Sequence, residues 1–153
     1  MFESSFTLLR DIGGFSVMPG EEIRFTIDAY HGFRYVSVRR YVETDGFSGA
    51  TRDGVTLTLE IVQALAPRIA ALPDDPKRLV PAQLGKFAKR PGICIVASVV
   101  EFKGRRGLDL RQWQQDVGWT KKGIWIPVEK IKEIKALFRK TQEALAEQPV
   151  DDF

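Results

Sequence analysis

The sequence predicts an α+β fold made of two tandem repeats, each an antiparallel β-sheet followed by a helix. One phrase occurs twice, as "TRDGVTLTLE" at residues 51–60 and as "TKKGIWIPVE" at residues 120–129. Upstream of it, "AYHGFRYVSVRRYVETDG" at residues 29–46 matches "EFKGRRGLDLRQWQQDVG" at residues 101–118. Both copies then pass from a two-residue hydrophobic period to a helical one, which indicates strands followed by a helix.

The offset between the copies identifies their corresponding residues. It is 72 before the repeated phrase and 69 within it, so the first copy carries three extra residues in a loop. Loops accept such insertions at little cost in free energy. The matched pairs are Tyr30 with Phe102, Gly32 with Gly104, Arg39 with Arg111, Tyr41 with Trp113, Gly46 with Gly118 and Gly54 with Gly123.

The first copy predicts three strands and a helix in order. "IRFTIDAY" at residues 23–30 alternates apolar and polar side chains, as a half-buried strand does. His31 and Gly32 form a turn into "FRYVSVRRYV", and the loop around Gly46 leads into the strand "GVTLTLE". A helix follows from about Glu60, and we expect Pro67 to kink or interrupt it because proline removes a backbone hydrogen bond.

The second copy predicts the same elements with a longer helix. Its strands are "ICIVASVVEF", "GLDLRQWQ" and "GIWIPVE", and Pro127 precedes a helix from about Val128 to Glu147. Ile131, Ile134 and Phe138 supply the apolar stripe of that helix. The segments "FTLLRDI" and "QLGKFAK" before the two copies are candidates for an additional outer strand in each sheet.

These patterns divide the chain into residues 1–72 as repeat 1, 73–82 as a linker, 83–147 as repeat 2 and 148–153 as an acidic tail. The linker prediction rests on the stretch "LPDDPKRLVPA", which holds three prolines.

Charge is distributed unevenly along the chain. The formal net charge is only +3, but residues 83–140 hold 14 basic against 5 acidic side chains, and residues 23–72 hold 6 against 5. Residues 141–153 carry four acids and no base. This asymmetry favours a polyanionic partner for the second repeat.

The sequence lacks the motifs that several classes of function require. The single cysteine, Cys94, lies in an apolar run and is predicted to be buried, so neither a disulfide framework nor a Cys-His metal cluster is expected. The sequence has no phosphate-cradling glycine loop, and its one histidine, His31, fits an ordinary surface turn. We expect no enzymatic activity and no cofactor.

The N-terminus lacks a signal peptide pattern and no apolar run could span a bilayer, which predicts a soluble protein of a reducing compartment, the cytoplasm.

Alternation also assigns side chains to the faces of the sheets. If Leu108 and Leu110 face the helix, their neighbours lie on the opposite, open face. The side chains expected on or beside that face are Phe102, Lys103, Arg105, Asp109, Arg111 and Trp113 in the second copy, and Tyr30, Arg39 and Tyr41 in the first. Aromatic rings that stack on bases, next to cations that contact phosphates, are typical of proteins that bind single-stranded nucleic acid.

A packing interpretation stands beside this one. Aromatic residues are frequent in strands, so these rings and Trp125 could instead fill an interface between the repeats. Lys121 and Lys122 could likewise form a solvated turn.

The stretches "YVSVRRYV", "EFKGRRGLDLRQW" and "TKKGIWIPVE" resemble the single-strand DNA-binding domain of the positive cofactor four transcriptional coactivators. Two copies of the family's domain, one after the other, match nearly the whole chain, apart from the linker and the two ends. It implies domains of about 65 residues with a curved antiparallel sheet and a kinked helix, which usually pair as homodimers. We therefore expect the two copies to pair within one chain as a pseudo-dimer.

The resemblance also implies which residues bind the strand. The stacking aromatic before the turn glycine falls on Phe102, and on Tyr30 in the first copy. The basic residues of that turn fall on Lys103 and Arg105, whereas the first copy has His31 and Phe33. The strand arginine falls on Arg39 and Arg111, and the lysine before the third strand on Lys122, where the first copy has Asp53. Lys121 and Arg52 are the adjacent cations. The family's tryptophan falls on Val42 and Gln114, so that contact is absent.

Two functions follow as alternatives. The first is a sequence-tolerant binder of single-stranded DNA, or of RNA, in transcription, replication or repair, with repeat 2 supplying most of the phosphate affinity. The second is a protein-interaction scaffold whose nucleic-acid face has decayed. The end "EALAEQPVDDF" is similar to the acidic tips by which single-strand binding proteins recruit replication partners, although a frayed, solvated tail is the favoured interpretation. We expect no membrane partner, and either a monomeric pseudo-dimer or a homodimer.

Overall fold

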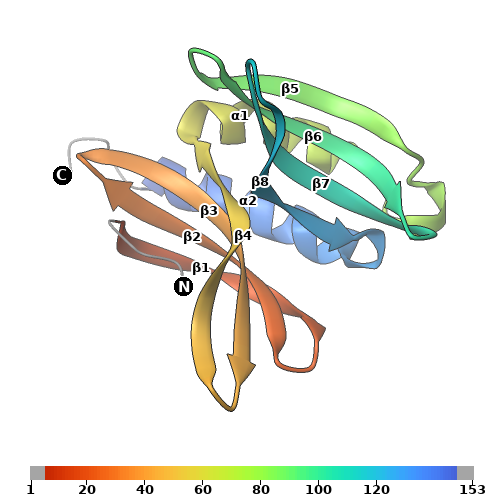
Figure 1. Ribbon diagram of the computed structural model, residues 1–153, viewed down its shortest axis with the longest axis horizontal. Helices are drawn as coiled ribbons and strands as arrows, with labels where there is room; N and C mark the ends of the chain where they lie inside the picture. The colour runs from red at the N-terminus through yellow and green to blue at the C-terminus, as the bar shows by residue number, and fades with distance from the viewer. Residues whose placement is uncertain (1–5, 148–153) are drawn as a thin grey trace.

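The computed structural model describes residues 6–147, which form two four-stranded antiparallel sheets, each followed by a helix (Figure 1). The tail at residues 148–153 lies outside the described residues. The first sheet consists of β1 (Thr7–Met18), β2 (Glu21–Tyr30), β3 (Phe33–Thr44) and β4 (Phe47–Thr58). The second consists of β5 (Ala82–Arg90), β6 (Ile93–Phe102), β7 (Arg105–Gln114) and β8 (Gly118–Pro127). The predicted α+β class and the predicted outer strands are confirmed.

Each sheet is a meander in which strands pair in chain order, and both sheets bend at corresponding places. The pairing of β3 with β4 shifts register between Arg39 and Tyr41, and the pairing of β7 with β8 shifts between Arg111 and Trp113. A bulge adds local twist and curvature to a sheet. The two repeats therefore share their irregular features as well as their regular ones.

Helix α1 (Leu59–Ala70) begins where Thr58 caps it, its side-chain oxygen accepting a hydrogen bond from the Ile61 amide at 3.2 Å. We expected Pro67 to kink or interrupt this helix. The helix is not interrupted there, because it continues to Ala70 and ends within one turn of the proline.

Helix α2 (Ile131–Glu147) starts later than the sequence indicated, because residues Val128–Lys130 form a 3₁₀ turn after Pro127. Ile131, Ile134 and Phe138 are buried, as their spacing predicted. No helix among residues 6–147 is long and apolar enough to cross a membrane.

The two repeats share one apolar core. The ring of Phe25 on β2 lies edge-on to the ring of Phe138 on α2, with 5.2 Å between their centroids. Helix α2 contacts β1 and β2 of the first sheet, α1 contacts β5 of the second, and the helices contact each other. Strand β4 lies against β8 where the sheets meet. Each helix thus helps to cover the sheet of the other repeat.

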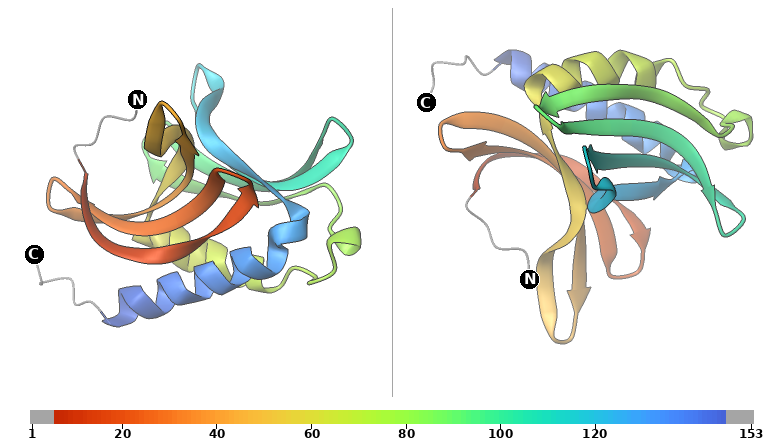
Figure 2. Two further views of the ribbon diagram at one scale, coloured as in Figure 1. Left: turned by 90° about the horizontal axis from the view of Figure 1, so that it is seen from below. Right: turned by 45° about the horizontal axis from the view of Figure 1, so that its top comes forward.

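The linker also ties the repeats together. It contains a 3₁₀ turn at Pro76–Arg78, and strand β5 begins at Ala82, one residue before the predicted boundary. Lys135 on α2 forms an ion pair with Asp74 at 2.7 Å and donates a hydrogen bond to the Leu72 carbonyl. Both helices lie on the same side of the molecule, which leaves the opposite faces of both sheets uncovered by helices (Figure 2, left).

Candidate nucleic-acid interface

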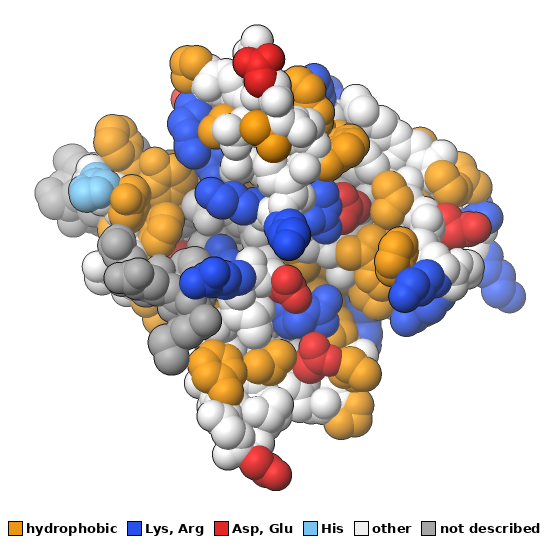
Figure 3. Space-filling view, viewed as in Figure 1, with side chains coloured by type: hydrophobic (Ala, Val, Ile, Leu, Met, Phe, Trp, Pro, Cys, Tyr) orange, Lys and Arg blue, Asp and Glu red, His pale blue; other side chains and the backbone are white. Residues whose placement is uncertain are grey.

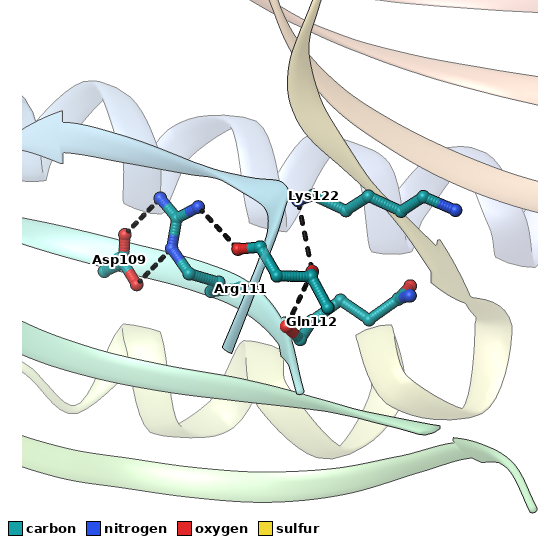
Figure 4. A network of polar contacts seen from close by, with 5 residues as sticks. Asp109, Arg111, Gln112 and Lys122 are labelled. Atoms are coloured by element: carbon teal, nitrogen blue, oxygen red, sulfur yellow. Dashed lines mark hydrogen bonds and ion pairs between the residues drawn. The ribbon is translucent and has the colours of Figure 1, made fainter. Parts of the chain in front are cut away.

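The repeated Thr-x-x-Gly sequence closes the bulge in each sheet. The Thr120 hydroxyl donates to the Gln112 carbonyl at 2.9 Å and accepts from the Lys122 amide at 3.2 Å (Figure 4). In the first sheet, Thr51 makes the same two bonds, to the Arg40 carbonyl at 2.9 Å and from the Asp53 amide at 3.1 Å. One hydroxyl therefore satisfies backbone groups that the bulge removes from the strand ladder.

The glycine of the same sequence makes room for the strand arginine. A Cβ atom at Gly54 would lie 2.9 Å from the guanidinium carbon of Arg39, and one at Gly123 would lie 2.8 Å from that of Arg111. Each guanidinium donates to the carbonyl of the bulge threonine, at 3.2 Å for Arg39 and 3.3 Å for Arg111. Thr, Gly and Arg thus form one structural unit, which explains why the phrase occurs twice.

Both strand arginines already have partners within the protein. Arg111 donates to both carboxylate oxygens of Asp109, at 3.0 and 3.2 Å. Arg39 is 8 % exposed, and burial lowers the pKa of its guanidinium from the ordinary value. These arginines shape the open faces, and a phosphate would have to compete for them with existing acceptors.

Strand pairing places the predicted aromatic residues of the second repeat on one face. Trp113 pairs with Cys94, Arg111 with Val96, and Phe102 with Arg105, so all of them lie on the side away from the helices. Leu108 and Leu110 are buried on the other side, as the alternation predicted.

Cations lie over three rings of this face. The Lys86 ammonium is 4.5 Å from the centre of the Trp113 ring, and that of Lys103 is 5.3 Å from the centre of Phe102. The Arg105 guanidinium carbon is 5.7 Å from the centre of the Trp125 ring. Arg105 also approaches Glu129 at 3.8 Å, but both side chains are largely exposed, so this pair is weak.

Three further residues contribute to the face: the sequence alone did not assign Trp119 or Lys86 to it, and it indicated Trp125 only as a candidate for packing between the repeats. Trp119 on β8 pairs with Trp113 and is 60 % exposed, as is Phe102. Trp125 lies against Gly107, where an added Cβ would approach its ring to 2.2 Å. Lys86 comes from the outer strand β5. Trp119 and Trp125 are an even number of positions apart, and this spacing could have predicted that both lie on one face of the strand. Lys86 could be assigned to the face only once the pairing of β5 with β6 was known.

The second repeat presents several lysines without acidic partners. Lys121 and Lys122 are exposed in the bulge of β8, between the paired residues Trp119 and Gly123. No carboxylate among residues 6–147 forms an ion pair with them, or with Lys86, Lys89 or Lys103. Figure 3 views the open faces and shows Lys and Arg side chains gathered over the middle of the molecule. A surface with such an excess of cations attracts polyanions.

Lys89 lies where the two sheets approach each other. Burial, together with the neighbouring cations Arg90, Lys122 and Arg39, lowers its pKa to about 8. Cations from β3, β5 and β8 thus act on one another across the junction of the repeats, which favours a bound anion there.

The open face of the first sheet has a different electrostatic character. Nη2 of Arg24 donates to both carboxylate oxygens of Asp11, at 2.8 and 2.7 Å, and Nη1 contacts Glu22 at 3.1 Å. Arg40 pairs with the core residue Ile23 and therefore lies on the other side of the sheet, where it approaches Glu21 at 3.6 Å and Asp53 at 3.8 Å.

The predicted residues of this sheet are placed as follows. Tyr30 lies at the β2–β3 turn, its ring stacked on Phe6 with 4.6 Å between centroids. Tyr41 is half-buried and Arg52 is exposed. The charge of Arg24 on this face is neutralised by Asp11 and Glu22, in contrast to the lysines of the second sheet.

Comparison with known protein families finds no matching family model, and comparison with curated proteins finds no match. The relationship to the positive cofactor four family therefore remains a prediction from the residues quoted above. Among the described residues, no group of His, Cys, Asp and Glu side chains could hold a metal ion.

Proposed function

We propose that this protein binds single-stranded nucleic acid, DNA or RNA, in transcription, replication or repair, and that it is a tandem relative of the positive cofactor four coactivators. The observation that carries the proposal is the open face of β5–β8. There, the rings of Phe102, Trp113 and Trp119 lie beside lysines that have no carboxylate partner in the described chain.

Two interactions would contribute to the binding affinity of this face: stacking of bases on the rings and attraction between lysines and phosphates. A base stacked on an aromatic side chain contributes roughly 1 to 3 kcal/mol, whatever the base, because every base has a π face. Lysines that contact phosphates add affinity by releasing counterions. Binding through these two terms tolerates sequence, and the face has few groups that could read the edge of a base.

We also propose that the two repeats pair as an intrachain pseudo-dimer. The shared core, the contact of β4 with β8 and the reciprocal packing of each helix on the other sheet support this arrangement. A repeat of this size would bury only about 60 % of its surface alone and would be marginally stable. Pairing within one chain removes the entropy cost of associating two chains.

The neutralised face of the first sheet favours a second candidate function for that half of the chain. The carboxylates of Asp11 and Glu22 already pair Arg24, so this face is poorly suited to phosphates. A scaffold that docks a protein partner would have the same properties. The proposal is therefore asymmetric, with the second sheet as the main nucleic-acid surface.

A fluorescence titration with oligo(dT) at two salt concentrations tests the function. All three tryptophans belong to the second repeat, and Trp113 and Trp119 lie on the proposed surface. We expect oligo(dT) to quench their fluorescence, and we expect the affinity to fall as salt rises, with a slope of about −0.7 in log K against log salt for each phosphate contacted. An unchanged emission, or an affinity independent of salt, would favour the scaffold.

A further inference from the structure

The open face of the first sheet is hollowed. A cavity of about 360 Å³ lies there, and its walls include Tyr41, Phe47 and Phe6. Asp28 and Arg39 also line it. Aromatic walls with a few convergent polar groups, in a volume of this order, are typical of sites for a small ring system.

Asp28 is the unusual member of this cavity. It is 8 % exposed, and both hydrogen bonds that it receives reach one oxygen, Oδ2, from Ser37 at 2.6 Å and Thr26 at 3.2 Å. Within residues 6–147 its other oxygen, Oδ1, accepts no hydrogen bond. Oδ1 is not among the buried polar atoms that lack a partner, so a donor that enters the cavity can reach it.

The second sheet has no equivalent of this group. The residue 72 positions after Asp28 is Val100, and Asp109 on the open face of that sheet is already bound to Arg111 through both oxygens. A carboxylate also opposes phosphate binding, since the two carry the same charge. Asp28 therefore fits the recognition of a donor on a base better than a general role in holding the strand.

We propose that the cavity formed by Asp28, Tyr41 and Phe47 receives one base of the bound strand and selects guanine. This inference rests on the proposed function and assigns the first sheet a specificity that the second lacks. An ionised carboxylate only accepts hydrogen bonds, and guanine presents two adjacent donors, N1–H and the N2 amino group, on its Watson–Crick edge. Adenine and cytosine offer one amino group, and thymine flanks its single N–H with two carbonyl oxygens that repel a carboxylate.

The test compares three fluorescein-labelled oligonucleotides: oligo(dT), the same strand with one central dG, and the same strand with inosine in place of that dG. A single guanine avoids the structures that guanine runs form. We expect the dG strand to bind about tenfold more tightly than oligo(dT), because both guanine donors can reach Oδ1 and hydrogen bonds to a charged group discriminate to that degree. Inosine, which lacks the N2 amino group, should lose most of that gain.

Asp28→Asn tests the assigned residue, with Asp45→Asn in the exposed β3–β4 turn as a control of equal charge change. Asp28→Asn should abolish the preference for dG and bind oligo(dT) more tightly, since it removes a negative charge from the face. Asp45→Asn should keep the preference. If Asp28→Asn does not fold, judged by thermal melting, the inosine comparison with the unaltered protein decides.

The outcomes separate this inference from the proposed function. Equal binding of all three strands overturns the guanine pocket and leaves single-strand binding intact. A dG preference that survives Asp28→Asn, or that inosine retains in full, also overturns it. Failure of every strand to bind at low salt overturns both proposals together.

Discussion

Lys121→Glu combined with Lys122→Glu is expected to weaken oligo(dT) binding by about a hundredfold at low salt. Both lysines are exposed at the Thr-x-x-Gly sequence of β8. The substitution removes two phosphate contacts and adds two repulsive charges. It should also reduce the slope of log K against log salt by about 1.4, which corresponds to two contacts with a single strand. Fluorescence anisotropy of a labelled oligonucleotide at several salt concentrations measures both quantities.

Two comparisons make this result specific. Lys132→Glu with Lys140→Glu changes the net charge equally on the exposed surface of α2, on the helical side of the molecule, and should cost far less affinity. Replacing Arg39 alone should also cost less, because this arginine is buried and bonded to the Thr51 carbonyl. Equal losses for the β8 lysines and for Arg39 would contradict the asymmetry between the sheets.

Phe138→Ala is expected to lower the free energy of unfolding by about 3 to 5 kcal/mol, the usual cost of truncating a fully buried phenylalanine. Phe138 on α2 is 2 % exposed and packs against Phe25 on β2, so the cavity opens between the two repeats. Lys140→Ala, at an exposed position of the same helix, should change stability by less than about 0.5 kcal/mol.

The form of the unfolding curve reports on the pairing of the repeats. Tryptophan fluorescence follows only the second repeat, whereas far-ultraviolet circular dichroism follows both. Chemical denaturation of the parent and of Phe138→Ala should give coincident transitions by the two probes, as a single cooperative unit requires. Separate transitions, with Phe138→Ala affecting only the second, would contradict the shared core.

The parts of the fold that repeat along the chain could be predicted from sequence. Alternation placed Leu108 and Leu110 in the core and their neighbours on the open face, because the two-residue period of a strand fixes the side of each residue. The offset of the copies also aligned the Thr-x-x-Gly sequences. Their role in closing a bulge could be recognised only from the hydrogen bonds of the threonine hydroxyls in the structure. The predicted outer strands followed from short apolar runs alone.

Partners distant in sequence could not be predicted in the same way. A helical period shows that Phe138 is buried but not that it lies against Phe25 in the other repeat, and nothing local links Lys86 to Trp113. The cavity around Asp28 was missed for a related reason. In the alternating strand "IRFTIDAY" this residue resembles any solvated polar position, and its burial depends on neighbouring strands and aromatic side chains.

Sedimentation of the protein with and without oligo(dT) tests the central claim most directly, that one chain pairs its own repeats into a complete single-strand binding unit. The account predicts a compact particle with the mass of one chain, and a complex that contains the oligonucleotide at low salt and loses it at high salt. A protein that sediments as a dimer would show that each repeat pairs across chains. A monomer that never sediments with the oligonucleotide would contradict the binding function itself.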